Sequence, residues 1–97
     1  MKFAILFEDN PERAAVRAQL MPDHLAFLER NAATILAAGP LAESGAPAGG
    51  LWLVEAADEP SARALIEADP FWPTGLRKSV RILRWNQVFA AGKRLTN

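Results

Sequence analysis

One histidine and one inward-facing carboxylate are the residues of this chain best suited to chemistry. His24 is the only histidine and there is no cysteine, so proton transfer near neutral pH depends on its imidazole. Asp69 shares one stripe of a 3.6-residue period with Ala62, Leu65 and Ile66, which directs its carboxylate toward the core. An ionised acid held there needs a partner. We predict that His24 is that partner.

If the two side chains meet, Asp69 orients the imidazole while His24 moves a proton. Other interpretations stay open. Asp69 precedes a proline, where aspartate commonly opens a turn, and His24 can be a packing or surface residue. Arg81 and Arg84 are alternative partners for the acid. Acyl transfer by Ser44, His24 and Asp69 is also conceivable, but no Gly-x-Ser-x-Gly motif surrounds Ser44.

The composition excludes several classes of protein. Eleven basic residues balance eleven acidic ones, which argues against a nucleic-acid binder. One histidine and no cysteine exclude disulfides, iron–sulfur clusters and a multi-histidine metal site within one chain, so we predict no metal and no cofactor. The apolar runs are shorter than the roughly 20 residues of a membrane span, and the first is too short for a signal peptide. We therefore expect no membrane partner and a cytoplasmic location.

Hydrophobic periodicity predicts the elements that position these residues. Strands are expected over residues 2–8, 34–40, 51–55 and 79–85, and helices over residues 12–20 and 22–33. A further helix is expected to be capped by Asp58 or Ser61, with Pro60 in its first turn, and to end at Asp69. Pro22 is expected to break the first helix from the second, which places His24 in a first helical turn, at the edge of the apolar stripe. The members of that stripe are Leu25, Leu28, Ala32, Ile35 and Leu36.

A pocket is predicted around His24. Aromatic side chains that follow Asp69, Phe71 and Trp72, are expected to wall it, with Trp52 as a further candidate. The end of the second strand and the loop expected over residues 41–50 would edge it, through the backbone and hydroxyl groups of Gly39, Pro40 and Ser44.

The order strand, helix, strand, strand, helix, strand predicts a single ferredoxin-like α+β domain over residues 1–97, with a split β-α-β arrangement and a four-stranded antiparallel sheet. Two helices cover only one face of such a sheet. The strands over residues 2–8 and 51–55 are apolar on both faces, so the second face needs cover as well. We predict a homodimer packed through its sheet faces.

Several short segments, taken in order, resemble the YCII-related family. They are an N-terminal strand, residues 21–25 (Met-Pro-Asp-His-Leu), residues 39–40 (Gly-Pro), residues 68–71 (Ala-Asp-Pro-Phe), Gly75, and a last strand with Val80 and Ile82. The resemblance implies a fold of the dimeric α/β-barrel type and a His–Asp active site, which falls on His24 and Asp69. Some relatives are lyase-like enzymes of chlorinated hydroxyquinol compounds. Trp72 followed by proline departs from the common family pattern.

Two functions from different classes follow. The first is a cofactor-free, lyase- or isomerase-like enzyme in which His24 and Asp69 act on a small, partly apolar enol- or phenol-like molecule. The alternative is a non-catalytic dimeric module that binds a small ligand or a partner protein. A histidine nitrogen within hydrogen-bond reach of Asp69 in one cavity favours the enzyme, and side chains that point apart into solvent favour the module.

Overall fold

The computed structural model describes residues 1–95. Four strands form one antiparallel sheet in the order β2-β3-β1-β4, and two main helices connect them. The elements are β1 (Lys2–Asp9), a 3₁₀ turn (Pro11–Arg13), α1 (Ala14–Arg30), β2 (Ile35–Glu43), β3 (Ala46–Glu55), α2 (Glu59–Glu67), a second 3₁₀ turn (Trp72–Thr74), β4 (Arg77–Arg84), β5 (Phe89–Ala90) and β6 (Lys93–Arg94). The predicted ferredoxin-like α+β fold is confirmed.

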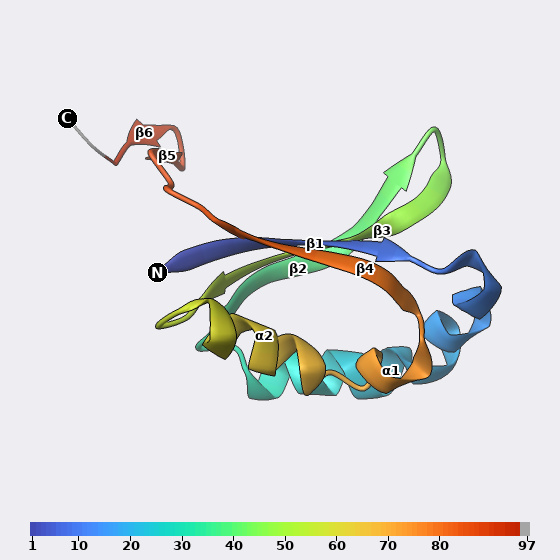
Figure 1. Ribbon diagram of the computed structural model, residues 1–97. Helices are drawn as coiled ribbons and strands as arrows, with labels where there is room; N and C mark the ends of the chain where they lie inside the picture. Colours follow the sequence, from blue (N-terminus) through green and yellow to red (C-terminus); the bar gives the residue numbers. More distant parts are fainter. Residues whose placement is uncertain (96–97) are drawn as a thin grey trace.

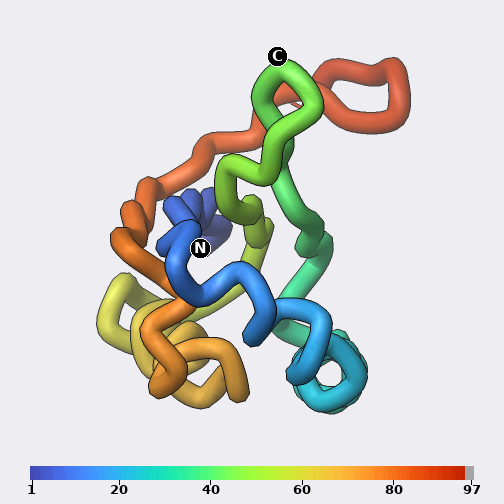
Figure 2. Tube along the Cα trace, turned by 90° about the vertical axis from the view of Figure 1, so that its right-hand side faces the viewer, coloured from blue at the N-terminus to red at the C-terminus, as the bar shows by residue number. Residues whose placement is uncertain are grey.

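Both helices lie on the same face of the sheet and run in opposite directions (Figure 1). The β2–β3 hairpin and the small β5–β6 hairpin project on the side away from the helices (Figure 2). Because both helices lie on one face, the other face of the sheet is left uncovered.

Among residues 1–95, no helix is long and apolar enough to cross a lipid bilayer.

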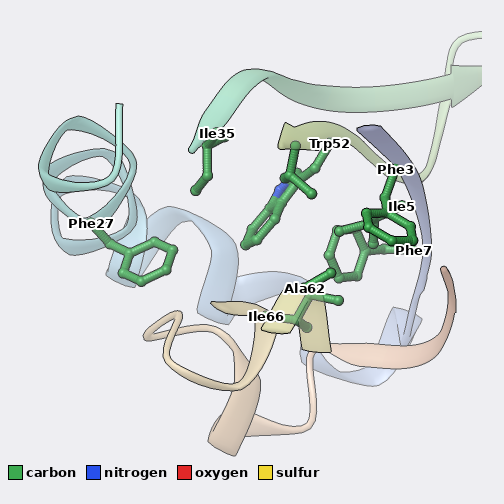
Figure 3. Packing of buried hydrophobic residues seen from close by; sticks show 9 residues of the cluster. Phe3, Ile5, Phe7, Phe27, Ile35, Trp52, Ala62 and Ile66 are labelled. Atoms are coloured by element: carbon green, nitrogen blue, oxygen red, sulfur yellow. The ribbon is translucent and has the colours of Figure 1, made fainter. Parts of the chain in front are cut away.

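The core fills the space between the sheet and the helices (Figure 3). Strand residues alternate between the two faces, so every second side chain of β1 points inward. The inward residues from the central strands and the two helices bury their side chains together: Phe3, Ile5, Phe7, Phe27, Ile35, Trp52, Val54, Ala62 and Ile66. Each large side chain buried in this way stabilises the fold by about 1.5–3 kcal/mol. The outward residues of the central strands, among them Leu6 and Leu51, remain partly exposed.

The predicted break near Pro22 is wrong, because α1 continues through it. Proline removes one backbone hydrogen bond from a helix, but the ring of Pro22 points to the exposed side, and packing of the opposite side keeps the helix intact. The predicted apolar stripe is also rotated. His24 and Phe27 are buried, whereas Leu25 is 48% exposed. His24 therefore lies in the middle of a long helix and not in a first turn.

The predicted loop over residues 41–50 is also wrong, because most of it is strand. β2 runs on to Glu43 and β3 begins at Ala46, so only Ser44 and Gly45 form the turn. Both have positive φ angles, 50° and 81°, as a two-residue hairpin turn requires. Further along β3, Gly49 passes so close to β1 that an added Cβ would lie 1.8 Å from the carbonyl oxygen of Phe7. Strand β4 begins at Arg77, two residues before the predicted start at residue 79.

Candidate active site

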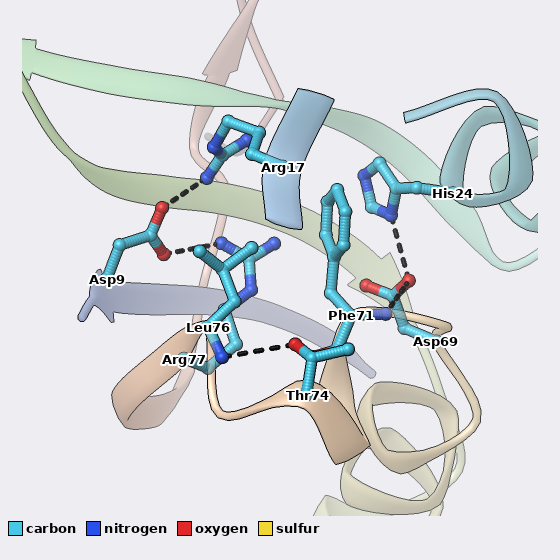
Figure 4. A network of polar contacts seen from close by, with 8 residues as sticks. All are labelled: Asp9, Arg17, His24, Asp69, Phe71, Thr74, Leu76 and Arg77. Atoms are coloured by element: carbon cyan, nitrogen blue, oxygen red, sulfur yellow. Dashed lines mark hydrogen bonds and ion pairs between the residues drawn. The ribbon is translucent and has the colours of Figure 1, made fainter. Parts of the chain in front are cut away.

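The structure brings His24 and Asp69 together. His24 comes from the middle of α1, and Asp69 lies in the turn that follows α2 (Figure 4). Nδ1 of His24 is 2.9 Å from Oδ1 of Asp69, and both residues are buried. The same carboxylate oxygen accepts a hydrogen bond of 3.2 Å from the backbone N–H of Phe71. Asp69 is therefore a turn residue and the histidine's partner at once. Arg81 and Arg84, the alternative partners, lie exposed on β4.

This contact selects the tautomer of the neutral imidazole. A carboxylate only accepts hydrogen bonds, so in the neutral ring Nδ1 of His24 carries the proton and Nε2 has the lone pair. Within residues 1–95, no side chain or backbone group bonds Nε2. His24 can therefore accept a proton at Nε2 while Asp69 stabilises the resulting imidazolium.

Aromatic packing fixes the orientation of the imidazole. The His24 ring stacks on Phe71 with 4.2 Å between ring centroids and 21° between planes. The ring of Trp52 is also near, with its centroid 6.2 Å from that of His24 and 29° between planes. Phe71 and Trp52 are themselves fully buried, so the imidazole has rigid aromatic neighbours.

His24 lines a pocket of about 70 Å³ between α1 and the inner face of the sheet. This volume is far below the roughly 300–1,000 Å³ of most ligand sites, which indicates a small ligand. The pocket is lined by Arg17, Met21, His24, Leu25, Ala38, Gly39, Pro40, Gly50, Trp52 and Arg77. A larger hollow of about 490 Å³ lies near the β2–β3 turn, but it contains neither His24 nor Asp69. We assign the candidate site to the smaller pocket because His24, whose Nε2 can act as a base, lines it.

The predicted pocket residues separate into three groups. Gly39 and Pro40 line the pocket, as expected. Phe71 backs the histidine ring without lining the pocket, and Trp72 packs against the core. Ser44 lies in the β2–β3 turn and lines the other hollow. The structure therefore does not assemble Ser44 into a triad with the histidine.

Two arginines and an aspartate that we did not predict complete the site. Nη1 of Arg77 donates to Oδ1 of Asp9 at 2.9 Å, and Nη2 of Arg17 donates to Oδ2 of the same carboxylate. The Arg77 guanidinium also lies 4.1 Å over the ring of Phe7. Burial lowers the pKa of Arg77, the hydrogen bond and charge of Asp9 oppose that shift, and the charge of Arg17 adds to it.

A β-bulge explains why Arg77 points inward. Glu8 pairs with Ser79 but Asp9 pairs with Arg77, so Lys78 is an extra residue in the ladder. In a regular strand Lys78 would face inward with Val80; with the bulge it faces outward and Arg77 takes the inner place. Hydrophobic patterning carries no signal for such a bulge.

The sequence does carry a signal for Arg17. This residue precedes His24 by seven residues, or two helical turns, and a continuous α1 puts both on one face.

Among residues 1–95, no three His, Asp or Glu side chains gather as the ligands of a metal ion would. The polar groups of the site are the His24–Asp69 pair and the two guanidinium groups. The site can move a proton at Nε2 of His24, and Arg17 and Arg77 can hold negative charge.

Comparisons with known proteins bear on the fold and the family. A solved structure of 5-chloro-2-hydroxyhydroquinone dehydrochlorinase (TftG) from Burkholderia phenoliruptrix AC1100, in complex with 2,5-dihydroxybenzoquinone, superposes with a TM-score of 0.78. It is 29% identical, and the match covers 89% of this chain and 94% of that chain. The similarity confirms the predicted fold of the dimeric α/β-barrel type. No curated protein sequence matches the chain. The model of the YCII-related domain matches residues 1–86, so the chain belongs to the YCII-related family.

Proposed function

We propose that the chain is a cofactor-free, lyase- or isomerase-like enzyme that transfers a proton on a small, partly apolar enol- or phenol-like molecule. The observation that carries this proposal is the 2.9 Å contact between Asp69 and Nδ1 of His24, with the imidazole lining a pocket. The similarity to a dehydrochlorinase supports it, because that enzyme's name describes an elimination from a hydroxylated ring. Its bound molecule, 2,5-dihydroxybenzoquinone, is a small ring with acidic hydroxyl groups, which is the chemistry proposed here.

The proposed reaction begins when Nε2 of His24 accepts a proton from a substrate hydroxyl or an acidified C–H group. The electron pair of the broken bond stays on the substrate, and Asp69 stabilises the imidazolium. The pair can then expel a leaving group as an anion, which completes an elimination. Alternatively, His24 returns the proton to a different atom, which completes an isomerisation. Trp52 would provide an apolar wall and Gly39 and Pro40 a backbone edge.

The same contacts weigh against the non-catalytic module. That alternative expects His24 and Asp69 to point apart into solvent, whereas both are buried and hydrogen-bonded to each other. A purely structural pair would also have no reason to leave Nε2 of the histidine facing a pocket. The enzyme is therefore the function that the geometry supports best.

The test is activity of folded variants on a panel of chlorinated and chlorine-free hydroxyquinols, followed by chloride release and by solvent deuterium exchange. His24→Gln should lower kcat/KM by about 10²–10⁴-fold, the usual contribution of a general acid–base group. Asp69→Asn should reduce kcat more than it raises KM. Asp23→Asn, an exposed change on the same helix, is the matched control and should leave the rate unaltered. Full activity in folded His24→Gln would overturn the proposal, and tight binding without turnover or exchange would assign the module instead.

We also propose that the chain forms a homodimer through the uncovered face of the sheet. The register places the outward side chains of β1 opposite those of β3 and β4, so they form one apolar patch: Ala4, Leu6, Leu51, Leu53 and Leu83. Contiguous apolar patches of this kind commonly mark an interface. Leu51→Lys should yield a monomer by sedimentation velocity, whereas Ala26→Lys on the exposed side of α1 should not. A parent chain that is monomeric at micromolar concentration would refute the dimer. The cytoplasmic location stays a prediction.

A further inference from the structure

The pocket that His24 lines also carries two cations. Arg17 and Arg77 both line it, from α1 and from the first residue of β4. Their guanidinium carbons lie 5.6 Å and 5.3 Å from the centroid of the Phe71 ring, whose face carries the stacked imidazole (Figure 4). The Phe71 ring therefore lies between the imidazole and the two guanidinium groups.

The carboxylates that hold these groups stay behind the pocket wall. Asp9 bonds both guanidinium groups and Asp69 bonds the imidazole, yet neither carboxylate lines the pocket. Asp9 bonds two cations, and the charge of Asp69 also acts on Arg77, but the cations and not the carboxylates line the pocket. A small ligand in the pocket would meet the acceptor nitrogen of His24 and the N–H donors of the two arginines.

Arg77 is also incompletely satisfied. Its side chain is 3% exposed, and its buried Nε has no hydrogen-bond partner among the described residues. Burial of a guanidinium with only one anionic partner is costly, and this desolvation is the main reason that the pKa of Arg77 is lowered. Structures rarely retain such a group without a purpose, and an added anion would compensate it.

We propose that Arg77, with Arg17, binds an anionic oxygen of the substrate in the pocket that His24 lines. This inference rests on the proposed function, because it assigns the charge of the molecule on which His24 acts. The substrate class is then a small molecule whose oxygen is negatively charged when bound, or becomes so as the proton leaves.

The step balances within the pocket. The proton passes to Nε2 of His24, and the electron pair of the broken bond remains on the substrate as negative charge spread over its oxygens. Arg77 and Arg17 stabilise that charge through N–H donors, in the manner of an oxyanion hole. An arginine suits this position better than a lysine because its planar fork can contact two oxygens of one ring at once. Gly50 beside Arg77 keeps the wall open, since an added Cβ there would lie 3.4 Å from Nη1.

The test is a comparison of three probes of similar shape, measured by calorimetry at mildly alkaline pH: 4-nitrophenolate, 4-nitrobenzoate and the uncharged 4-nitroanisole. The parent chain should bind an anionic probe about 10- to 100-fold more tightly than 4-nitroanisole, as expected for hydrogen bonds to charged groups. Arg77→Met should remove most of that preference, and Arg17→Met should reduce it. Arg84→Met, at the exposed end of the same strand, is the matched control and should retain it.

Each outcome has one meaning. Equal affinity for 4-nitroanisole and the anions, or a full preference in Arg77→Met, overturns the inference. A stronger preference for phenolate than for benzoate assigns a phenol or enol substrate, and the reverse assigns a carboxylic acid. If Arg77→Met does not fold, Asp9→Asn combined with Arg77→Gln removes both charges together and should also lose the preference. His24→Gln should keep the preference, so an anion preference without any turnover would refute the proposed function alone.

Discussion

Replacement of Asp69 separates its role as a hydrogen-bond acceptor from its role as a charge. Asp69→Ala leaves the Nδ1–H of His24 and the backbone N–H of Phe71 without an acceptor, in a site where Asp69 itself is 3% exposed. Each buried group left unsatisfied costs about 1–3 kcal/mol, so we expect a loss of about 2–5 kcal/mol. A domain of this size has roughly 5–15 kcal/mol of stability, so the loss is a large part of the total.

Asp69→Asn is the matched variant. One oxygen, Oδ1, accepts both hydrogen bonds, so the carbonyl oxygen of an asparagine can accept both as well. Only the charge is lost, and because charge-assisted bonds are about twice as strong as neutral ones, we expect a cost of about 1 kcal/mol. Catalysis should nevertheless fall sharply, since a neutral amide stabilises an imidazolium poorly.

Urea unfolding followed by tryptophan fluorescence measures both stabilities, with Trp52 as a buried reporter. The expected order is parent, Asp69→Asn, then Asp69→Ala, with at least about 1 kcal/mol between the two variants. Equal stability of Asp69→Ala and Asp69→Asn would refute the acceptor role. Equal activity of Asp69→Asn and the parent would refute the need for its charge.

Three further predictions concern stability. Gly49→Ala should lower the free energy of unfolding, measured by urea unfolding, by about 3 kcal/mol or more. The reason is that the added Cβ would collide with the carbonyl oxygen of Phe7. Pro22→Ala should raise the free energy of unfolding by about 1–2 kcal/mol by restoring a helix hydrogen bond, measured in the same way. Asp58→Ala should lower the Tm at neutral pH. Hydrogen bonds from the side chain and then the backbone of Ser61 lower the pKa of Asp58, so this stabilisation is complete above the carboxyl's ordinary pKa and disappears as the pH falls through its folded value.

Controls are available for each of these variants. Gly45→Ala has open space around the added Cβ, so it carries only the strain of a positive φ and should cost less than Gly49→Ala. Ala26→Pro, on the exposed side of the same helix, should destabilise as much as Pro22→Ala stabilises, or more. For Asp58→Ala, thermal unfolding below about pH 4 should show a smaller difference from the parent than at pH 7. Asp58 is the N-cap of α2, and a difference that grows in acid would contradict the stabilising role of its charge there.

The contact between His24 and Asp69 was predictable because the sequence offers few alternatives. An acid on the apolar side of a short helix needs a partner, and only one side chain could be both a partner and a base. The element order was equally informative, since strand and helix periods alternate in the pattern of a ferredoxin-like domain. These features depend on residue types and on short-range periodicity, which a single sequence records directly.

The features that escaped prediction depend on tertiary packing. Pro22 is a strong local signal for a helix boundary, yet contacts of the buried face outweigh it, so the helix register and the burial of His24 were misplaced. Ser44 was chosen by its polar side chain in an expected loop, but pairing of β2 with β3 draws most of that segment into the sheet. Arg77 was overlooked because strand alternation alone would turn Lys78 inward.

The bulge at the start of β4 offers a way to change the charge that lines the pocket without changing the core. Two neighbouring cations, Arg77 and Lys78, compete for one inward position, and the location of a single extra residue selects between them. If the extra residue lay elsewhere in the strand, Lys78 would take the inward position, and Val80 and Ile82 would keep theirs. The ammonium group of Lys78, a single point charge, would then replace the planar guanidinium group of Arg77. Insertions and deletions at this one site would therefore be an economical evolutionary route between related enzymes with different substrates, and a practical target for redesign.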